Sequence, residues 1–116
     1  MKMKRGSICL ANLNPVTGHE QAGTRPCLVI SAEGFNNGGA DLVIVLPLTK
    51  TERGIPAHIE ICSPEGGLSY KSFVMCEMIR SISKKRIIKN LGIVSDDTMI
   101  QVEKNLTRLL GFSRYL

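Results

Sequence analysis

One segment of the chain concentrates side chains that could act on a phosphate group. Between two apolar runs it carries a histidine, a carboxylate, an amide, a hydroxyl and a guanidinium, at His19, Glu20, Gln21, Thr24 and Arg25. We expect Arg25 to lie just before a strand over residues 26–31, with its root held and its guanidinium free. A guanidinium in that position can bind phosphate through two hydrogen bonds. The alternative interpretation is a solvated arginine at a strand end.

A second polar point and two histidines add to this chemistry. Thr49 directly follows an apolar run at residues 41–48, and its hydroxyl could either bond a phosphate oxygen or simply end the strand. Cleavage of RNA by its own 2′-hydroxyl needs a base and an acid, the roles that histidines often fill. His58 alternates with Glu60 along a predicted strand, which favours a solvent-facing side chain. Nothing in the sequence brings His19 to His58.

The sequence lacks the motifs of several other enzyme classes. It contains no G-x-S-x-G, no Walker loop and no H-E-x-x-H. Its four cysteines form no C-x-x-C pair, which argues against zinc and favours small buried side chains kept reduced in a cytosol; they are Cys9, Cys27, Cys62 and Cys76. Aromatic residues make up 4% of the chain, which speaks against a base-stacking platform like that of RNA-recognition motifs.

The composition limits the kinds of partner and the compartment. A formal net charge of +5 is compatible with binding to phosphate backbones, acidic proteins or anionic membranes. The charge alone does not distinguish among these partners. No apolar run approaches the roughly 20 residues of a membrane-spanning helix, and the N-terminus does not resemble a signal peptide. We therefore expect a cytoplasmic protein with a single domain over residues 1–116.

The apolar pattern predicts several short strands and one helix. Strands are expected at residues 7–13, 26–31, 41–48, 57–62, 72–81 and 87–94, the fifth bent near Glu77. Gly38-Gly39 and Gly66-Gly67 resemble hairpin turns. Ser95 is a plausible N-cap for a helix that ends at Gly111, with Met99, Val102, Leu106, Leu109 and Leu110 at helical spacing. This pattern indicates a mainly β fold, a small curled antiparallel sheet or barrel with a C-terminal helix.

Taken together, the motifs resemble those of the MazF/PemK toxins over nearly the whole chain and in the family's order. The matching pieces are Arg5-Gly6, Asn14-Pro15-x-x-Gly18-His19-Glu20-Gln21-x-Gly23-Thr24-Arg25-Pro26, Pro47-Leu48-Thr49, Glu65-Gly66-Gly67-Leu68 and the stretch at residues 76–82. The G-x-E-Q-x-G-x-R-P core is the specific part. Two departures concern Glu77, which is often aspartate in relatives, and Met78, which stands where they often have glutamine.

The resemblance implies an SH3-like barrel that forms a homodimer and cleaves single-stranded RNA at a short sequence without a metal or cofactor. The products would carry a 2′,3′-cyclic phosphate and a 5′-hydroxyl. The residues it implies for catalysis are Arg25, Thr49 and Glu20, and those for RNA binding are His19, Gln21, Thr24, Lys50, Arg53 and Glu77. Because arginine has a pKa above 12, we assign Arg25 mainly to charge stabilisation. The acceptor of the 2′-hydroxyl proton stays open among Glu20, His19 and the substrate.

The resemblance also implies a protein partner, an antitoxin with an acidic and largely disordered tail. Two other functions remain open at this point. A gyrase-poisoning toxin of the same barrel shape, as CcdB is, would close with a tryptophan near its C-terminus, whereas this chain has no tryptophan. A non-catalytic basic barrel would bind nucleic acid without cutting it.

Overall fold

The computed structural model describes residues 2–15 and 17–112. Two parts of the sequence discussed above lie outside the described residues. They are Val16, in the turn expected at residues 14–18, and the C-terminal residues 113–116, where a gyrase-poisoning toxin would have a tryptophan. In chain order the elements are β1 (Ser7–Asn12), β2 (Thr24–Val29), α1 (Glu33–Asn36), β3 (Leu42–Thr49), β4 (His58–Ile61), η1 (Glu65–Gly67), β5 (Ser72–Met75), η2 (Cys76–Met78), β6 (Arg80–Ser83), η3 (Lys84–Arg86), β7 (Ile87–Ile93) and α2 (Asp96–Leu110).

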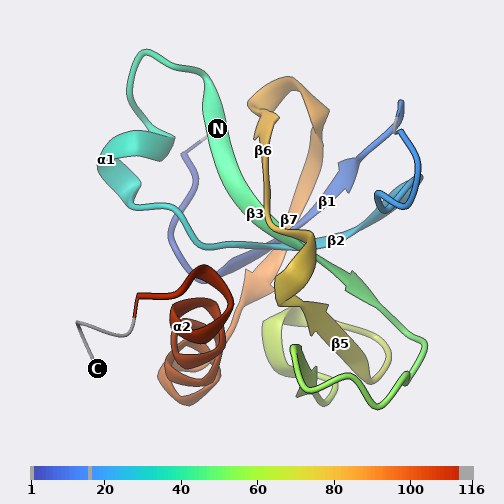
Figure 1. Cartoon of the computed structure of the whole chain (residues 1–116). Helices are drawn as coiled ribbons and strands as arrows, with labels where there is room; N and C mark the ends of the chain where they lie inside the picture. The colour runs from blue at the N-terminus through green and yellow to red at the C-terminus, as the bar shows by residue number, and fades with distance from the viewer. Residues whose placement is uncertain (1, 16, 113–116) are drawn as a thin grey trace.

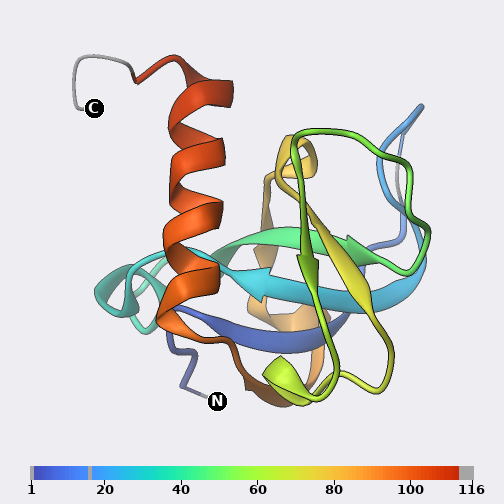
Figure 2. The same cartoon turned by 90° about the horizontal axis from the view of Figure 1, so that it is seen from below.

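The strands form one curled, antiparallel sheet beside a single long helix. Their order is β4-β5-β3-β2-β1-β7, and β6 pairs with the first half of β3. Figure 2 shows α2 standing along one side of this sheet. The predicted mainly β fold with a C-terminal helix is confirmed. The sheet stays open, because no ladder joins β4 to β7, the two ends of the strand path, in the part of the chain that the structure describes.

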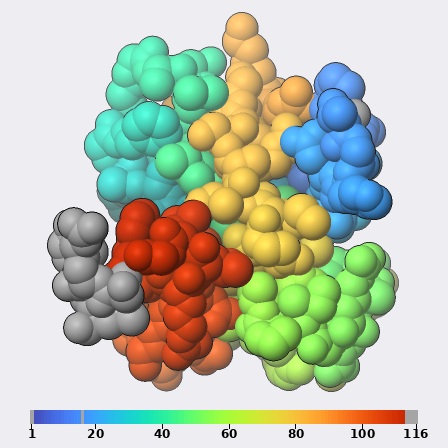
Figure 3. Space-filling model, viewed as in Figure 1, coloured from blue at the N-terminus to red at the C-terminus, as the bar shows by residue number. Residues whose placement is uncertain are grey.

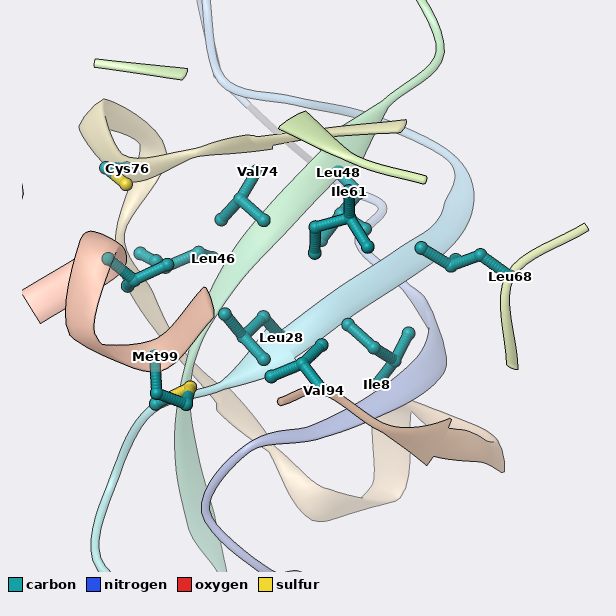
Figure 4. Packing of buried hydrophobic residues seen from close by; sticks show 11 residues of the cluster. Ile8, Leu28, Leu46, Leu48, Ile61, Leu68, Val74, Cys76, Val94 and Met99 are labelled. Carbon is teal, nitrogen blue, oxygen red and sulfur yellow. The ribbon is translucent and has the colours of Figure 1, made fainter. Parts of the chain in front are cut away.

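Side chains on both faces of the central strands are buried, in two separate clusters. Alternation along β1 sends Ile8 to one cluster and Cys9 to the other, and Leu28 and Val29 divide in the same way along β2. The larger cluster also includes Val102 and Met99 from α2, and Figure 4 shows Met99 among its neighbours. This packing fixes the strand register, since a slip by one residue would exchange the two faces.

The C-terminal helix begins and ends where its sequence predicts. The Ser95 hydroxyl accepts a hydrogen bond from the Thr98 amide, and Gly111 ends the helix with a φ of 76°. Leu106 packs against the larger cluster, whereas Leu109 and Leu110 are 46% and 47% exposed. The helix therefore leaves an apolar end uncovered.

Three expected features differ from the structure. The strand expected at residues 72–81 is two strands, because η2 interrupts it and redirects the chain from β5 to β6 (Figure 1). Residues 66–67 do lie between two antiparallel neighbours, β4 and β5, as expected of a hairpin, but they form a 3₁₀ turn inside a longer connection. The short helix α1 occupies part of a segment expected to be loop, where the side chain of Asn36 is buried and bonds to the carbonyl oxygens of Ser31 and Met3.

Candidate functional site

Arg25 and Thr49 lie on neighbouring strands. The β2–β3 ladder pairs Cys27 with Pro47, and Arg25 and Thr49 each lie two residues beyond this pair at the same end of the ladder. Both residues line the same groove, so the two groups expected to bind phosphate are brought together although they lie far apart in the sequence.

The Arg25 guanidinium is held by two backbone carbonyl groups. Its Nε donates to the Ala22 oxygen and its Nη1 to the Leu48 oxygen, each at 3.1 Å. These bonds leave three of its five N–H donors for a ligand. The expectation that Arg25 precedes the strand is wrong, because β2 begins at Thr24. The earlier start gives the half-buried side chain a rigid root.

The Thr49 hydroxyl already accepts one hydrogen bond within the protein. Its Oγ1 accepts a hydrogen bond from the Thr51 amide at 3.2 Å. A hydroxyl group that accepts in this way keeps its own proton for donation. Thr49 can therefore donate to an anionic oxygen without losing the bond that shapes the start of the β3–β4 loop.

These residues line a groove of about 500 Å³. Thr24, Arg25, Thr49 and Lys50 contribute one wall, so four of the predicted site residues are gathered there. The other wall comes from residues 67–70 and Ser72. Sequence reasoning did not assign this second wall. Gly67 and Leu68 belong to a family-like motif, but no spacing in the sequence links them to Arg25.

Close backbone packing holds the second wall in place. A Cβ on Gly67 would lie 1.9 Å from the Leu91 oxygen of β7, and one on Gly92 would lie 2.7 Å from the Gly66 carbonyl carbon. The two segments can approach this closely only because both positions are glycine.

The same wall is also tied to the start of α2. Glu65 Oε2 accepts hydrogen bonds from the Ser95 amide at 3.0 Å and from the Thr98 hydroxyl at 2.5 Å. Partial burial opposes ionisation of Glu65, but the bonds from Thr98 and Ser95 outweigh it, and the net effect is a lowered pKa. The ionised carboxylate therefore joins η1 to the helix.

Three other predicted site residues lie in the β1–β2 connection and do not line the groove. His19 and Glu20 are exposed, and Gln21 is half-buried. Glu20 Oε1 accepts a hydrogen bond from the Thr17 amide at 2.6 Å. Figure 3 shows this connection, in blue, on the same side of the molecule as the green β3–β4 loop.

The remaining predicted residues lie apart from the groove. Arg53 lines a separate hollow with His58 and Glu60. His58 Nε2 lies 2.8 Å from Glu77 Oε2, and its side chain is only 3% exposed, so the expected solvent-facing position is wrong. Among the described residues its Nδ1 has no hydrogen-bond partner. Glu77 is thus engaged with β4, because η2 folds back over that strand.

None of the four cysteines lines the groove. Cys9, Cys27 and Cys76 are buried as expected, whereas Cys62 is exposed, contrary to expectation. Burial raises the pKa of Cys9 to about 11 and that of Cys27 to about 12, so both thiols stay protonated at neutral pH. Over residues 2–15 and 17–112, no group of three or more His, Cys, Asp or Glu side chains is arranged to hold a metal ion. No helix within these ranges has the length and apolar character needed to cross a membrane.

Three solved or curated proteins resemble this chain over most of its length. The Endoribonuclease MazF of Staphylococcus epidermidis is 35% identical over 115 residues, which cover 97% of this chain and 95% of the relative. The crystal structure of MazF from Deinococcus radiodurans has a TM-score of 0.86 at 28% identity and covers 96% of this chain and 98% of that one. An endoribonuclease in complex with its cognate antitoxin, from Mycobacterial species, has a TM-score of 0.78 at 25% identity, with coverage of 94% and 95%.

The sequence pattern of a toxin family matches residues 4–110, and the resemblance inferred from the motifs is confirmed. The match includes both strands that carry Arg25 and Thr49. This chain belongs to the family of PemK-like, MazF-like toxins of type II toxin–antitoxin systems.

Proposed function

We propose that this chain is a ribosome-independent endoribonuclease toxin that cleaves single-stranded RNA at a short sequence and so stops translation and growth. The observation that carries the proposal is the Arg25 guanidinium, bonded at 3.1 Å to Leu48 beside Thr49 in a groove. The family membership and the 35% identity to a relative named Endoribonuclease MazF support it.

The reaction is attack of a ribose 2′-oxygen on the adjacent phosphorus. The new P–O2′ bond forms as the P–O5′ bond breaks, the 2′-hydroxyl proton leaves to a base, and the departing 5′-oxygen takes up a proton. The products are a 2′,3′-cyclic phosphate and a 5′-hydroxyl. In the transition state extra negative charge gathers on the phosphoryl oxygens, where the remaining N–H donors of Arg25 and the Thr49 hydroxyl can stabilise it. An acid role of Arg25 toward the 5′-oxygen is also open.

The base is a choice among Glu20, His19 and an oxygen of the substrate. Neither side chain lines the groove, so a protein base would have to approach from the β1–β2 connection. We include Glu20 in the catalytic set. A pH–rate profile of Glu20→Gln and His19→Gln separates the choices, since only loss of the true base removes the acidic limb of the profile.

RNA binding is assigned to residues in the groove and around it. Thr24 and Lys50 line it directly, and His19 and Gln21 belong to the adjoining connection. Arg53 and Glu77, which face other parts of the surface, are included as contacts to RNA that continues beyond the groove. The chain is proposed to act in the cytoplasm as one domain, without metal or cofactor.

The assembly is proposed to be a homodimer under the control of an acidic antitoxin. Leu109 and Leu110 offer an exposed apolar surface at the end of α2. The net charge of +5 suits an acidic partner as well as RNA.

The test is cleavage of a long, unstructured RNA in a ribosome-free mixture that contains a chelator. We expect cuts at one recurring short sequence, 2′,3′-cyclic phosphate ends, and cleavage slower by about 10²–10³ with Arg25→Ala. Loss of cleavage with the chelator and recovery with a divalent ion would overturn the mechanism. Binding without cleavage would favour the non-catalytic barrel.

A further inference from the structure

Tyr70 is an aromatic side chain displayed in the groove. Its exposure of 62% is the highest among the large apolar side chains of the described residues, and it lines the groove together with Arg25 and Thr49. The core does not need this ring, since so much of it faces solvent. An exposed ring at a phosphate-binding groove offers a flat face to an unpaired nucleobase.

A lysine that also lines the groove contacts the ring. Lys50 follows the last residue of β3, whereas Tyr70 lies between η1 and β5, and Lys50 Nζ is 4.2 Å from the ring centroid. A cation at this distance is attracted to the face of the ring. Both residues line the groove, so a ligand bound there can compete with Lys50 for the face of the ring.

The backbone beneath the ring is fixed from two sides. The Ser72 hydroxyl donates to the Tyr70 carbonyl oxygen at 3.0 Å, and Ser72 itself is buried at the start of β5. On the other side, Gly67 is packed against the Leu91 carbonyl. The ring is therefore positioned before any ligand arrives, which reduces the entropy lost on binding.

We propose that Tyr70 stacks on a nucleobase next to the scissile phosphate, and that Lys50 leaves the ring to bind a neighbouring phosphate. This subsite rests on the proposed function, because the phosphate at Arg25 and Thr49 places the nucleotide. The groove of about 500 Å³ falls in the size range of small-ligand pockets and admits a nucleotide. Stacking is tolerant of base identity, so Tyr70 adds affinity while polar contacts select the sequence.

The test measures binding of an RNA oligonucleotide that spans a mapped cut site and carries a 2′-deoxy nucleotide there, so that it cannot be cut. Tyr70→Ala should weaken binding by about 5- to 150-fold, the usual effect of losing one stacked base. Tyr70→Phe keeps the ring and should bind within about twofold of the parent. Phe35→Ala removes an exposed aromatic from α1, on the far side of the sheet in Figure 1, and should leave binding unchanged.

A scan of single abasic positions identifies the stacked base. At one position, base removal should weaken binding by the parent chain and have no further effect on Tyr70→Ala. Binding of Tyr70→Ala within about twofold of a parent that cuts RNA, or additive losses at every abasic position, would overturn this subsite alone. If the parent chain neither binds nor cuts RNA, the proposed function itself fails and the subsite fails with it.

Discussion

Arg25 Nη1 donates a hydrogen bond to the Leu48 carbonyl oxygen at 3.1 Å, which ties the guanidinium to the residue before Thr49. The bond connects the start of β2 with the end of β3, and the two strands run antiparallel. It also fixes the direction of the guanidinium. A donor held this way does not have to reorganise when charge develops on a phosphate.

Arg25→Ala is expected to lower the rate of RNA cleavage by about 10²–10³ while the chain stays folded. The side chain is half-buried at the groove and outside both core clusters, so its removal should not open the core. Arg25→Lys restores the charge but not the planar fork, and we expect it to recover little of the rate. Cleavage kinetics and circular dichroism measure the two effects. Near-normal turnover by folded Arg25→Ala would remove Arg25 from the mechanism.

Thr49→Ala is expected to have a smaller effect, because it removes one neutral hydrogen bond of about 1 kcal/mol, or roughly a fivefold change in rate. Thr49→Ser keeps the hydroxyl and the bond from the Thr51 amide, and should retain most of the activity. Single-turnover cleavage measures both variants. Equal rates for the alanine variant and the parent chain would leave Thr49 only a structural role.

The sequence was sufficient for the elements with strong local signals. Ser95 and Gly111 mark both ends of α2, and the apolar run before Thr49 marks β3, because caps and continuous apolar runs act within a few residues. The roles of Arg25 and Thr49 came from the family resemblance, because the local pattern alone also fits a solvated arginine and a strand-ending threonine.

The second groove wall and the position of His58 could not be read from local patterns. Tyr70 reaches the groove because Gly67 packs on Leu91, which lies 24 residues later in the sequence. The periodicity of apolar residues gives no information about such a distant contact. His58 alternates like a surface residue, yet η2 folds Glu77 over it. Such long-range packing overrides the local pattern.

Gly67→Ala is expected to destabilise the fold and to distort the groove. Its φ is +74°, and a Cβ there would clash with the Leu91 carbonyl oxygen. Backbone strain and overpacking together should lower the free energy of unfolding by about 3 kcal/mol or more. Gly54→Ala is the matched control, because its φ of +64° is similar but its surroundings are open, and it should lose only about 1–2 kcal/mol. Urea unfolding measures both. Equal losses in the two variants would mean that the η1–β7 contact can relax.

The stability that Glu65 contributes should depend on pH. Its hydrogen bonds lower its pKa from the ordinary value of 4.5, so the folded state favours the ionised carboxylate. The contribution is therefore present above pH 4.5 and is lost as pH falls through the lower folded-state pKa.

Glu65→Gln tests this dependence by urea unfolding between pH 7 and pH 3. The parent chain should be the more stable at pH 7, and the difference should shrink on acidification. Glu52→Gln removes an exposed carboxylate from the β3–β4 loop and controls for the loss of one charge. A difference that stays constant across the range would show that Glu65 acts only through packing.

RNA and an acidic antitoxin tail are expected to compete for the groove that Arg25, Thr49 and Lys50 line. The bounds expected from sequence, the loops at residues 18–25 and 49–56, are only partly right, because residues 67–70 line the groove and Arg53 does not. Lys50 lines the groove, and an acidic side chain would neutralise it as a phosphate does. Both ligands should therefore weaken as salt rises, and Lys50→Gln should weaken both and lower the salt dependence of RNA binding by about one ion. Arg53→Gln is the matched control for charge, because Arg53 lines a different hollow and its substitution should have the smaller effect.

The measurement is a titration of an acidic antitoxin peptide against the 2′-deoxy RNA oligonucleotide. Simultaneous and independent binding of the two ligands would show that the antitoxin does not inhibit by occluding the groove. Inhibition would then have to act by displacing the β1–β2 or the β3–β4 loop.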